Sequence, residues 1–229
     1  MIQIYGHKVA YGEFKGMNLE KSSYWSKTDM ITFILGTYEQ PILDQLIQFS
    51  KQNNSAFIDI GAGDGYFSVG MAYSNFFKKI YSFEVDQNSQ ENIKKNAQTN
   101  NCIDKINILG EANYFSLKNI IDNHKTAVMK IDIEGSEFEL LNEEVLNLLS
   151  KSFIIVELHP LNVVDGEKEE KRLFEKCKKF FYLSWIRREN YNPNFFKELY
   201  KFTDEERLIA LGEGRGSNMR WLVLNPKKL

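Results

Sequence analysis

A buried apolar segment that runs directly into closely spaced glycines is the feature that most constrains this chain. Residues 56–60 are mostly apolar, and Gly61, Gly63 and Gly65 follow within five positions. A short apolar run of this kind is typical of a strand buried on both faces of a sheet. Glycine allows a tight turn and a close backbone approach that a Cβ atom would block. The helical pattern that follows would present free N–H groups at the turn, so we predict a strand–turn–helix unit that binds a ligand.

The spacing of these glycines distinguishes between two kinds of ligand. A dinucleotide-binding turn has the pattern G-x-G-x-x-G, which would place the third glycine at position 66. That position is Tyr66 and the third glycine is Gly65, so the pattern is G-x-G-x-G. Asp59 precedes the turn, and a carboxylate there suits a positively charged ligand better than a pyrophosphate. S-adenosylmethionine (SAM) carries a sulfonium and an amino group, so the turn favours SAM over a nicotinamide cofactor.

A second acid lies where a nucleoside-binding residue is expected. Glu84 follows the apolar run 80–83 and stands 23 residues after Gly61. An acid about 20 residues beyond a glycine turn, at the end of the next strand, accepts hydrogen bonds from ribose hydroxyls. Asp86 lies two residues later and ranks second for this role. We therefore predict that Glu84 binds the ribose of the cofactor.

Short apolar runs alternate with helical patterns along most of the chain. This alternation is typical of a parallel sheet with helices on both faces. We expect an α/β, doubly wound fold with a mostly parallel seven-stranded sheet in one domain over 1–229. Within it we expect an N-terminal extension over 1–35, a cofactor-binding core over 36–160, and acceptor-side and closing strands over 161–229.

The element boundaries follow from the same patterns. The expected strands cover 56–60, 80–83, 106–109, 127–133, 153–158, 181–186 and 221–224. The expected helices cover 38–52, 67–73, 90–100, 140–149 and 167–180, and another starts at the capping-box pair Thr203 and Glu206. Residues 2–14 are expected to form a strand or hairpin beside the core.

Ionisable residues gather where the fourth and fifth expected strands end. Lys130 and Asp132 lie at the end of the fourth, and Glu157 and His159 end the fifth. Ligands of open α/β sheets bind outside the carboxyl ends of strands, so these four residues form the candidate catalytic set. A histidine of ordinary pKa, about 6.5, can take the proton of a hydroxyl acceptor, which makes His159 the first candidate base. Asp132 is the candidate for orienting the acceptor or for taking the proton instead.

The same strand ends offer ligands for a divalent metal. Asp132, Glu157 and His159 form a candidate set for Mg²⁺ or Mn²⁺, which would lower the pKa of an acceptor hydroxyl and orient it. Structural roles remain open for neighbouring acids. Glu134 and Glu137 suit the N-terminus of the following helix. Glu157 also suits an ion pair with the lysine of the neighbouring strand.

Four segments resemble, in the same order, the motifs of the FkbM-type methyltransferases. They read FIDIGAGDGYFS, YSFEVD, VMKIDIEGSEFELL and IIVELHP, and the upstream LGTYEQ resembles the segment that precedes the first strand in that family. The resemblance covers about residues 30–160, and the K-I-D-x-E-G-x-E block is its most specific part. It implies the class I methyltransferase fold, SAM as cofactor, and O-methylation, often of sugars, glycans or secondary metabolites.

The resemblance also implies where the cofactor lies. The glycine turn and Asp59 would hold the methionine part, Glu84 the ribose, and the residues after the third strand the adenine, while residues 38 and 39 would help close the pocket. Val85 stands where family members commonly have proline. The implied cofactor-binding residues are Tyr38, Glu39, Asp59, Gly61, Ala62, Gly63, Glu84, Val85, Glu111, Ala112 and Asp132.

Composition excludes several other classes. The 29 basic and 31 acidic residues give a net charge of −2 and no basic field for nucleic acid. The chain has neither a signal-peptide pattern at its start nor an apolar stretch long enough to cross a membrane. We therefore expect a cytoplasmic protein whose partner is a small molecule. Cys102 and Cys177 do not form a disulfide framework.

The last third of the chain supplies the expected acceptor side. It is rich in aromatic residues between positions 180 and 202, some of which suit stacking on a sugar. Arg187, Arg188 and Arg215 suit a phosphate, and the glycine-rich loop 212–216 is expected to border the site. We therefore expect a sugar or nucleotide-linked sugar as the acceptor.

Together these features predict a SAM-dependent O-methyltransferase. Its acceptor would be a hydroxyl of a sugar, a nucleotide-linked sugar or a related small metabolite, as in glycan or capsule biosynthesis. Two alternatives remain: a non-catalytic SAM-binding or assembly protein, and a nicotinamide-dependent oxidoreductase.

Overall fold

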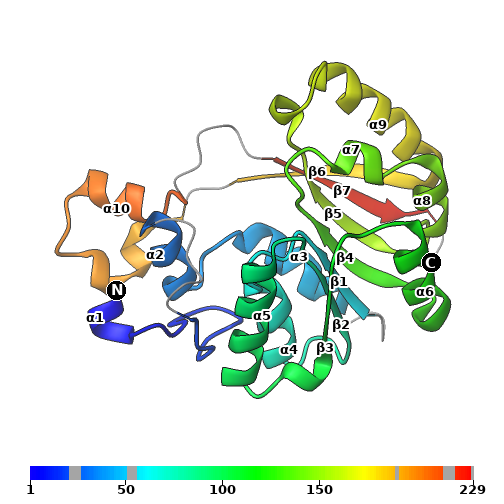
Figure 1. Cartoon of the computed structure of the whole chain (residues 1–229). Helices are drawn as coiled ribbons and strands as arrows, with labels where there is room; N and C mark the ends of the chain where they lie inside the picture. The colour runs from blue at the N-terminus through cyan, green and yellow to red at the C-terminus, as the bar shows by residue number, and fades with distance from the viewer. Residues whose placement is uncertain (21–26, 51–55, 189–190, 214–219, 228–229) are drawn as a thin grey trace.

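The computed structural model describes residues 1–20, 27–50, 56–188, 191–213 and 220–227. One seven-stranded sheet forms the centre of this part of the chain (Figure 1). The strands are β1 (Ala56–Ile60), β2 (Ile80–Phe83), β3 (Ile106–Leu109), β4 (Ala127–Ile131), β5 (Phe153–Glu157), β6 (Phe181–Arg187) and β7 (Arg220–Pro226). Their order is β3-β2-β1-β4-β5-β7-β6; β1 to β5 pair in parallel, and β7 runs antiparallel to both of its neighbours. The predicted α/β class and mostly parallel sheet are confirmed.

Helices cover both faces of this sheet. Those beside the sheet are α3 (Gln40–Ser50), α4 (Tyr66–Tyr73), α5 (Gln87–Thr99), α6 (Tyr114–His124), α7 (Glu137–Leu140), α8 (Glu143–Leu148) and α9 (Gly166–Phe180). Away from it lie α1 (Ile2–Tyr5), α2 (Lys27–Leu35) and α10 (Asp204–Ala210) (Figure 1). Short 3-10 helices occupy Ile103–Lys105, Pro160–Asn162, Pro193–Phe195 and Lys197–Leu199. Among the described residues, no helix is long and apolar enough to span a bilayer.

The central strands are buried on both faces. Phe57 of β1 and Val128 of β4 belong to the core shared with α3, α4 and α5. Their neighbours Ile58 and Met129 point to the opposite face, into the core shared with α6, α8 and α9. Because successive side chains of a strand point to opposite faces, burial of both faces requires an uninterrupted apolar run. This is why these strands could be recognised in the sequence.

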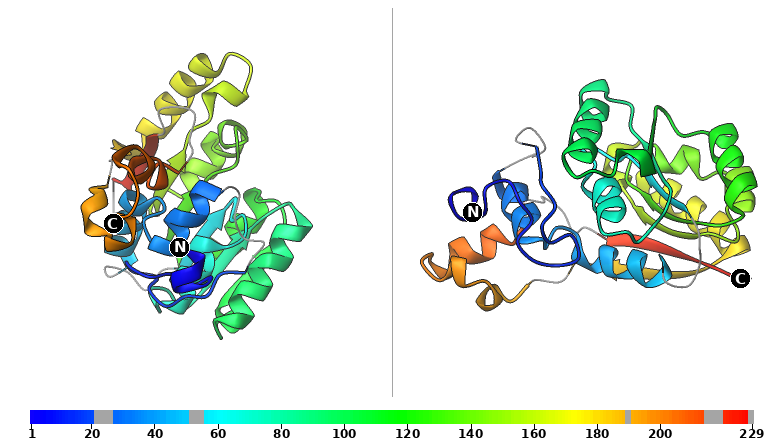
Figure 2. Two further views of the ribbon diagram at one scale, coloured as in Figure 1. Left: turned by 90° about the vertical axis from the view of Figure 1, so that its left-hand side faces the viewer. Right: turned by 90° about the horizontal axis from the view of Figure 1, so that it is seen from below.

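Two segments from opposite ends of the chain pack together beside the sheet (Figure 2). Leu35 lies in one apolar cluster with Phe196 and Leu199, and α10 packs against α2. The Tyr11 hydroxyl donates a hydrogen bond to a carboxylate oxygen of Glu198 over 2.8 Å. We call this unit the side lobe. It comprises α1, α2 and the described residues 191–213, while the loop between α1 and α2 extends onto α4 and α5.

The N-terminal extension differs from its prediction. Residues 2–14 do not form a strand or hairpin; they form α1 and a loop whose bridge pairs Lys8 with Asn18. Gly6, Gly12 and Gly16 all have positive φ angles, and this conformation interrupts an extended strand.

Helix boundaries also shift where side chains cap the backbone. The helix expected over 140–149 is divided into α7 and α8, because the Asn142 side chain accepts hydrogen bonds from the N–H groups of Glu144 and Val145 and so starts α8. The helix expected from residue 90 begins at Gln87 because Asp86 caps it through the N–H of Ser89. Asp86 therefore has a structural role, unlike the ribose role for which it ranked second.

We predict that both cysteines are unreactive in the folded protein. Burial raises the pKa of Cys177 to about 12 and also raises that of Cys102, and only the thiolate reacts with disulfide reagents. Ellman's reagent should therefore modify both thiols only after guanidinium is added. Rapid modification of either thiol in the native protein would show that the core around it is open.

Candidate cofactor and acceptor site

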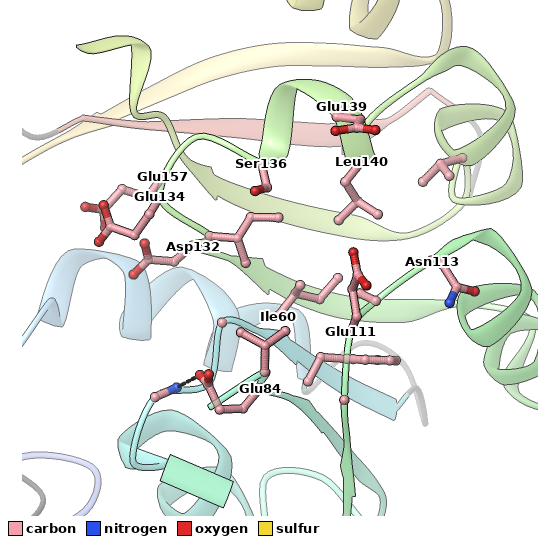
Figure 3. Close-up of a pocket in the computed structure, with 18 of the residues that line it drawn as sticks. Ile60, Glu84, Glu111, Asn113, Asp132, Glu134, Ser136, Glu139, Leu140 and Glu157 are labelled. Atoms are coloured by element: carbon pink, nitrogen blue, oxygen red, sulfur yellow. Dashed lines mark hydrogen bonds between the residues drawn. The ribbon is translucent and has the colours of Figure 1, made fainter. Parts of the chain in front are cut away.

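A cavity of about 710 Å³ lies along the carboxyl ends of the parallel strands (Figure 3). Ile60, Phe83 and Glu157 are the last residues of β1, β2 and β5, and Glu111 and Asp132 lie just beyond β3 and β4. In a parallel sheet all carboxyl ends meet at one edge, which is where such folds bind ligands. A smaller cavity of about 60 Å³ shares part of this lining, including Tyr38, Gly61, Gly63 and Asp132.

The glycine turn is held against the end of β4. Gly61 has a φ of +80°, and its N–H donates to the carbonyl of Phe83 over 2.9 Å. A Cβ atom on Gly61 would lie 1.7 Å from the carbonyl oxygen of Asp132. The N–H of Asp132 in turn donates to the carbonyl of Ile60 over 2.9 Å. The glycine is therefore required by the protein's own backbone, whether or not a ligand is bound.

Glu84 lies at the cavity wall beside this turn, as the sequence predicts. Its Oε2 atom accepts a hydrogen bond from the N–H of Gly63 over 2.8 Å, and Oε1 accepts one from the N–H of Asp86 over 2.9 Å (Figure 3). Each carboxylate oxygen keeps a further lone pair for a ligand hydroxyl. The largely exposed Val85 lines the cavity next to it. Two more expected cofactor residues, Glu111 and Ala112, also line the cavity.

Asp59 and Ala62 line the smaller cavity. Asp59 is almost completely buried, and burial raises its pKa to about 6 despite the attraction of Lys130 and the hydrogen bond from Ser68. Its Oδ2 atom accepts that bond over 2.6 Å, and Oδ1 has no hydrogen-bond partner among the described residues. A buried carboxylate oxygen of this kind is suited to a cationic ligand.

Lys130 is the buried cation of the site. Its ammonium lies 3.0 Å from Oδ2 of Asp132, 3.9 Å from Oε2 of Glu39 and over the ring of Phe67. Burial opposes the charge on Lys130, but the surrounding carboxylates outweigh burial and raise its pKa. The N–H of Glu39 also donates to Oε1 of Glu213 over 3.1 Å, which joins the site to the side lobe.

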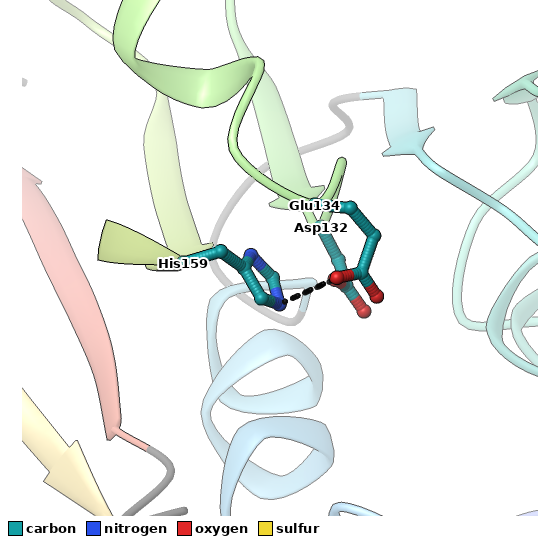
Figure 4. A group of neighbouring side chains, drawn as sticks. All are labelled: Asp132, Glu134 and His159. Carbon is teal, nitrogen blue, oxygen red and sulfur yellow. Dashed lines mark ion pairs between the residues drawn. The ribbon is translucent and has the colours of Figure 1, made fainter. Parts of the chain in front are cut away.

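His159 lies among four carboxylates, two of which, Asp132 and Glu134, are shown in Figure 4. Its Nε2 atom is 3.4 Å from Glu157 and 3.6 Å from both Asp132 and Glu134, and Nδ1 is 3.4 Å from Glu137. Burial opposes protonation of the ring, but the close carboxylates of Glu137, Glu157 and Asp132 raise its pKa to about 10. The imidazole is therefore protonated at neutral pH, which disfavours the predicted role as general base.

The remaining acids of this cluster divide between structural and cavity positions. Glu137 is completely buried and accepts hydrogen bonds from the N–H groups of Gly135 and His159. These contacts favour the structural role at the start of the following helix over a role in the chemistry. Glu157 lines the cavity and accepts a hydrogen bond from the Trp221 indole over 2.9 Å. Glu134, the most exposed of the cluster, also reaches the cavity.

The donor set fits a divalent metal only in part. The ligand atoms of Asp132, Glu134 and His159 lie within 4.8 Å of one another, as do those of Glu39, Asp132 and Glu157. The predicted set of Asp132, Glu157 and His159 is thus divided between two groups that share Asp132. A metal on Asp132 would compete with the ammonium already bonded to that carboxylate.

Sequence reasoning missed Glu213, which lines the larger cavity from the side lobe. The signal available was an acid between two glycines in the loop expected to border the site. Arg188 holds this loop: its guanidinium donates to the carbonyls of Leu211 and Gly212 and lies 3.8 Å from Glu213. These bonds compete with the phosphate-binding role expected of Arg188, and Arg215 lies outside the described residues.

We predict that Gly61→Ala strongly destabilises the fold. A left-handed backbone costs a residue with a Cβ roughly 1–2 kcal/mol, and the Asp132 carbonyl must also move. The melting temperature should fall by at least about 5 °C. Gly110→Ala is the matched control, since no atom lies within 4 Å of a Cβ there, and an equal effect of both changes would contradict this explanation.

We predict that His159 stays protonated throughout the neutral range. Because its folded pKa of about 10 exceeds the ordinary value of about 6.5, its ion pairs contribute full stability below about pH 6.5. That contribution is lost as the pH rises through about 10. The ¹⁵N chemical shifts of the His159 ring should remain those of imidazolium at pH 8, whereas in urea the ring should titrate near the ordinary value. A neutral ring in the native protein at pH 8 would contradict the assignment.

Comparison with solved structures identifies the fold. A proposed O-methyltransferase from Klebsiella pneumoniae superposes with a TM-score of 0.54 at 13% identity, covering 82% of this chain and 80% of the other. A precorrin-6y C5,15-methyltransferase from Geobacter metallireducens gives a TM-score of 0.53 at 14% identity, covering 90% and 92%. The tRNA methyltransferase TrmK from Bacillus subtilis gives 0.50 at 11% identity, covering 81% and 65%.

Neither protein-family models nor curated proteins match the sequence. The resemblance to FkbM-type methyltransferases therefore remains a prediction. At these identities the structural similarity concerns architecture alone, and the chain has the Rossmann-like fold of the class I methyltransferases.

Proposed function

We propose that this chain is a SAM-dependent methyltransferase that methylates a hydroxyl of a small, sugar-like molecule. The observation that carries the proposal is the placement of the Glu84 carboxylate, bonded to the Gly63 N–H at the wall of a large cavity. In the sequence, only their spacing relates this acid to the glycine turn, whereas in the structure the two are in direct contact. The architecture shared with solved methyltransferases supports it.

The lining gives each part of SAM a complementary neighbour. The ribose would bind Glu84, and the adenine would lie near Glu111 and Ala112. The methionine part would lie at the glycine turn, with its amino group toward Asp59 in the smaller cavity. Tyr38, which lines both cavities, would contact the cofactor between these parts.

Methyl transfer requires an acceptor oxygen in line with the sulfonium and a group that takes its proton. The acceptor oxygen bonds the methyl carbon as the carbon–sulfur bond breaks, and the proton passes to a base. Asp132 lines both cavities, whereas His159 is not among their described lining residues. We therefore assign the proton to Asp132.

Lys130 and His159 would position this carboxylate. Both cations lie beside Asp132, which is partly buried, and attract its carboxylate. A divalent metal bound there would supply Lewis-acid activation of the hydroxyl. The proposed proton transfer needs only the carboxylate.

The alternatives are less well supported by the cavity. A nicotinamide cofactor would need its pyrophosphate at the glycine turn, where the acids Asp59 and Glu84 lie close by. A nucleic-acid substrate would meet an acidic lining. A non-catalytic SAM-binding protein would share the cofactor contacts, and turnover of SAM with a hydroxyl acceptor distinguishes it from the enzyme.

We predict that S-adenosylhomocysteine binds with micromolar affinity, that NADH does not bind, and that Glu84→Ala weakens the binding about tenfold to a hundredfold. A hydrogen bond to a charged group contributes about 1.5–3 kcal/mol, which corresponds to that range. Isothermal titration calorimetry measures all three affinities.

The control for this experiment is Glu91→Gln, an exposed acid on α5 away from the cavity. Glu84→Gln, which keeps an acceptor for the Gly63 N–H, separates loss of the ribose contact from disruption of the turn. Binding of NADH without binding of S-adenosylhomocysteine would overturn the proposal in favour of an oxidoreductase.

A further inference from the structure

The charged residues that line the larger cavity are all acidic among the described residues. Of the described residues that line it, eight carry carboxylates and none is a lysine, arginine or histidine. Such a lining raises the local concentration of cations and repels phosphates. The carboxylates belong to Asp29, Glu84, Glu111, Asp132, Glu134, Glu139, Glu157 and Glu213.

The cofactor accounts for only part of this charge. Figure 3 shows Asp132, Glu134 and Glu157 gathered at one end of the cavity, away from Glu111. Glu213 lines the same cavity, and its contact with the N–H of Glu39 ties it to the Lys130 group. If the cofactor occupies the glycine turn and the Glu111 end, these carboxylates face the acceptor.

The cations nearby are held by groups of the protein. Lys130 contacts Asp132 and Glu39, and His159 contacts Asp132, Glu134 and Glu157. Arg188 is bound to loop carbonyls beside Glu213. The described part of the site thus has more acids than bases at this end, and its bases are engaged with protein groups.

A buried hydroxyl in the adjoining smaller cavity is a second observation, and it points to a polar ligand beside these carboxylates. The Tyr66 hydroxyl has no hydrogen-bond partner among the described residues, although the side chain is 8% exposed and lines the smaller cavity beside Asp132. Burial, followed by the charges of Glu213 and Glu39, raises its pKa, so it stays a neutral donor. A buried polar group without a partner costs about 1–3 kcal/mol, which a polar ligand would offset.

We propose, on the basis of the proposed methyltransferase function, that the acceptor carries a protonated amine beside the hydroxyl that is methylated. Glu134, Glu157 and Glu213 form the wall that receives the amine, as in an amino sugar. The same carboxylates would repel the phosphate of a phosphorylated or nucleotide-linked acceptor.

Protonation of the amine also explains selectivity for oxygen. An ammonium held by carboxylates has no lone pair to attack the methyl group, so the neighbouring hydroxyl is the available nucleophile. Its oxygen forms the new bond to carbon, the carbon–sulfur bond of SAM breaks, and Asp132 takes the hydroxyl proton. The amine itself remains unchanged.

The test compares matched sugars on the full chain loaded with S-adenosylhomocysteine. D-glucosamine, N-acetyl-D-glucosamine and D-glucose 6-phosphate present an ammonium, a neutral amide and a phosphate on one scaffold. Saturation-transfer NMR at neutral pH and low salt should show D-glucosamine binding at least about tenfold more tightly than its acetylated form, and no binding of the phosphate. High salt should weaken the preference.

Substitutions in the cavity wall test which residues cause the preference for D-glucosamine. Glu134→Gln and Glu213→Gln should each weaken D-glucosamine about three- to fivefold, while leaving the affinity for S-adenosylhomocysteine unchanged. Glu144→Gln, an exposed acid of α8 outside the cavity, is the matched control and should have no effect. Equal loss in the control variant would assign the preference to the general charge of the protein and overturn the proposal.

The outcomes separate the two proposals. Failure of S-adenosylhomocysteine to bind defeats the methyltransferase function itself. Normal binding of S-adenosylhomocysteine with equal affinity for the two sugars, or with no binding of D-glucosamine at tens of millimolar, defeats only the amine-bearing acceptor. Micromolar binding of Mn²⁺ that displaces D-glucosamine assigns the acidic wall to a metal and also overturns the proposal.

Discussion

The site depends on the contact between the backbone of Gly61 and the carbonyl of Asp132. Parallel pairing of β1 with β4 brings these two chain segments so close that no side chain fits between them. The chain turns toward α4 at this contact, and Asp132 lies on the wall of both cavities. The close approach of the two backbones thus fixes both the glycine turn and the candidate base Asp132, and a shift of one requires a shift of the other.

Charge compensation is the second organising principle. Asp59, Glu39 and Asp132 are tolerated at the sheet edge because the ammonium of Lys130 lies among them. His159 has the same relation to the acids on the β5 side. Breaking a buried ion pair leaves an uncompensated charge, which costs more than the pair contributes. Substitution of either cation therefore affects folding as well as chemistry.

Features governed by local sequence were predictable, and those governed by distant contacts were not. The apolar runs predicted the sheet, and the spacing from Gly61 to Glu84 predicted that this acid lies beside the glycine turn, because burial on two faces and a tight turn leave signatures within a few residues. The strand or hairpin predicted over residues 2–14 was wrong because this segment contacts residues distant in the sequence, such as Glu198. The raised pKa of His159 could not be predicted because it arises from three acids, Asp132, Glu137 and Glu157, whose distances to the ring depend on the fold.

The two halves of the side lobe are synthesised at different times. Its two halves lie near opposite ends of the sequence, so they meet only after the intervening sheet strands have been made. Glu213 belongs to the later half, so the acidic end of the cavity is completed only after the strands β1 to β6 have been synthesised. In the proposed function, the last residue of the acceptor wall is therefore synthesised well after the residues that would bind the cofactor, which lie between positions 38 and 132.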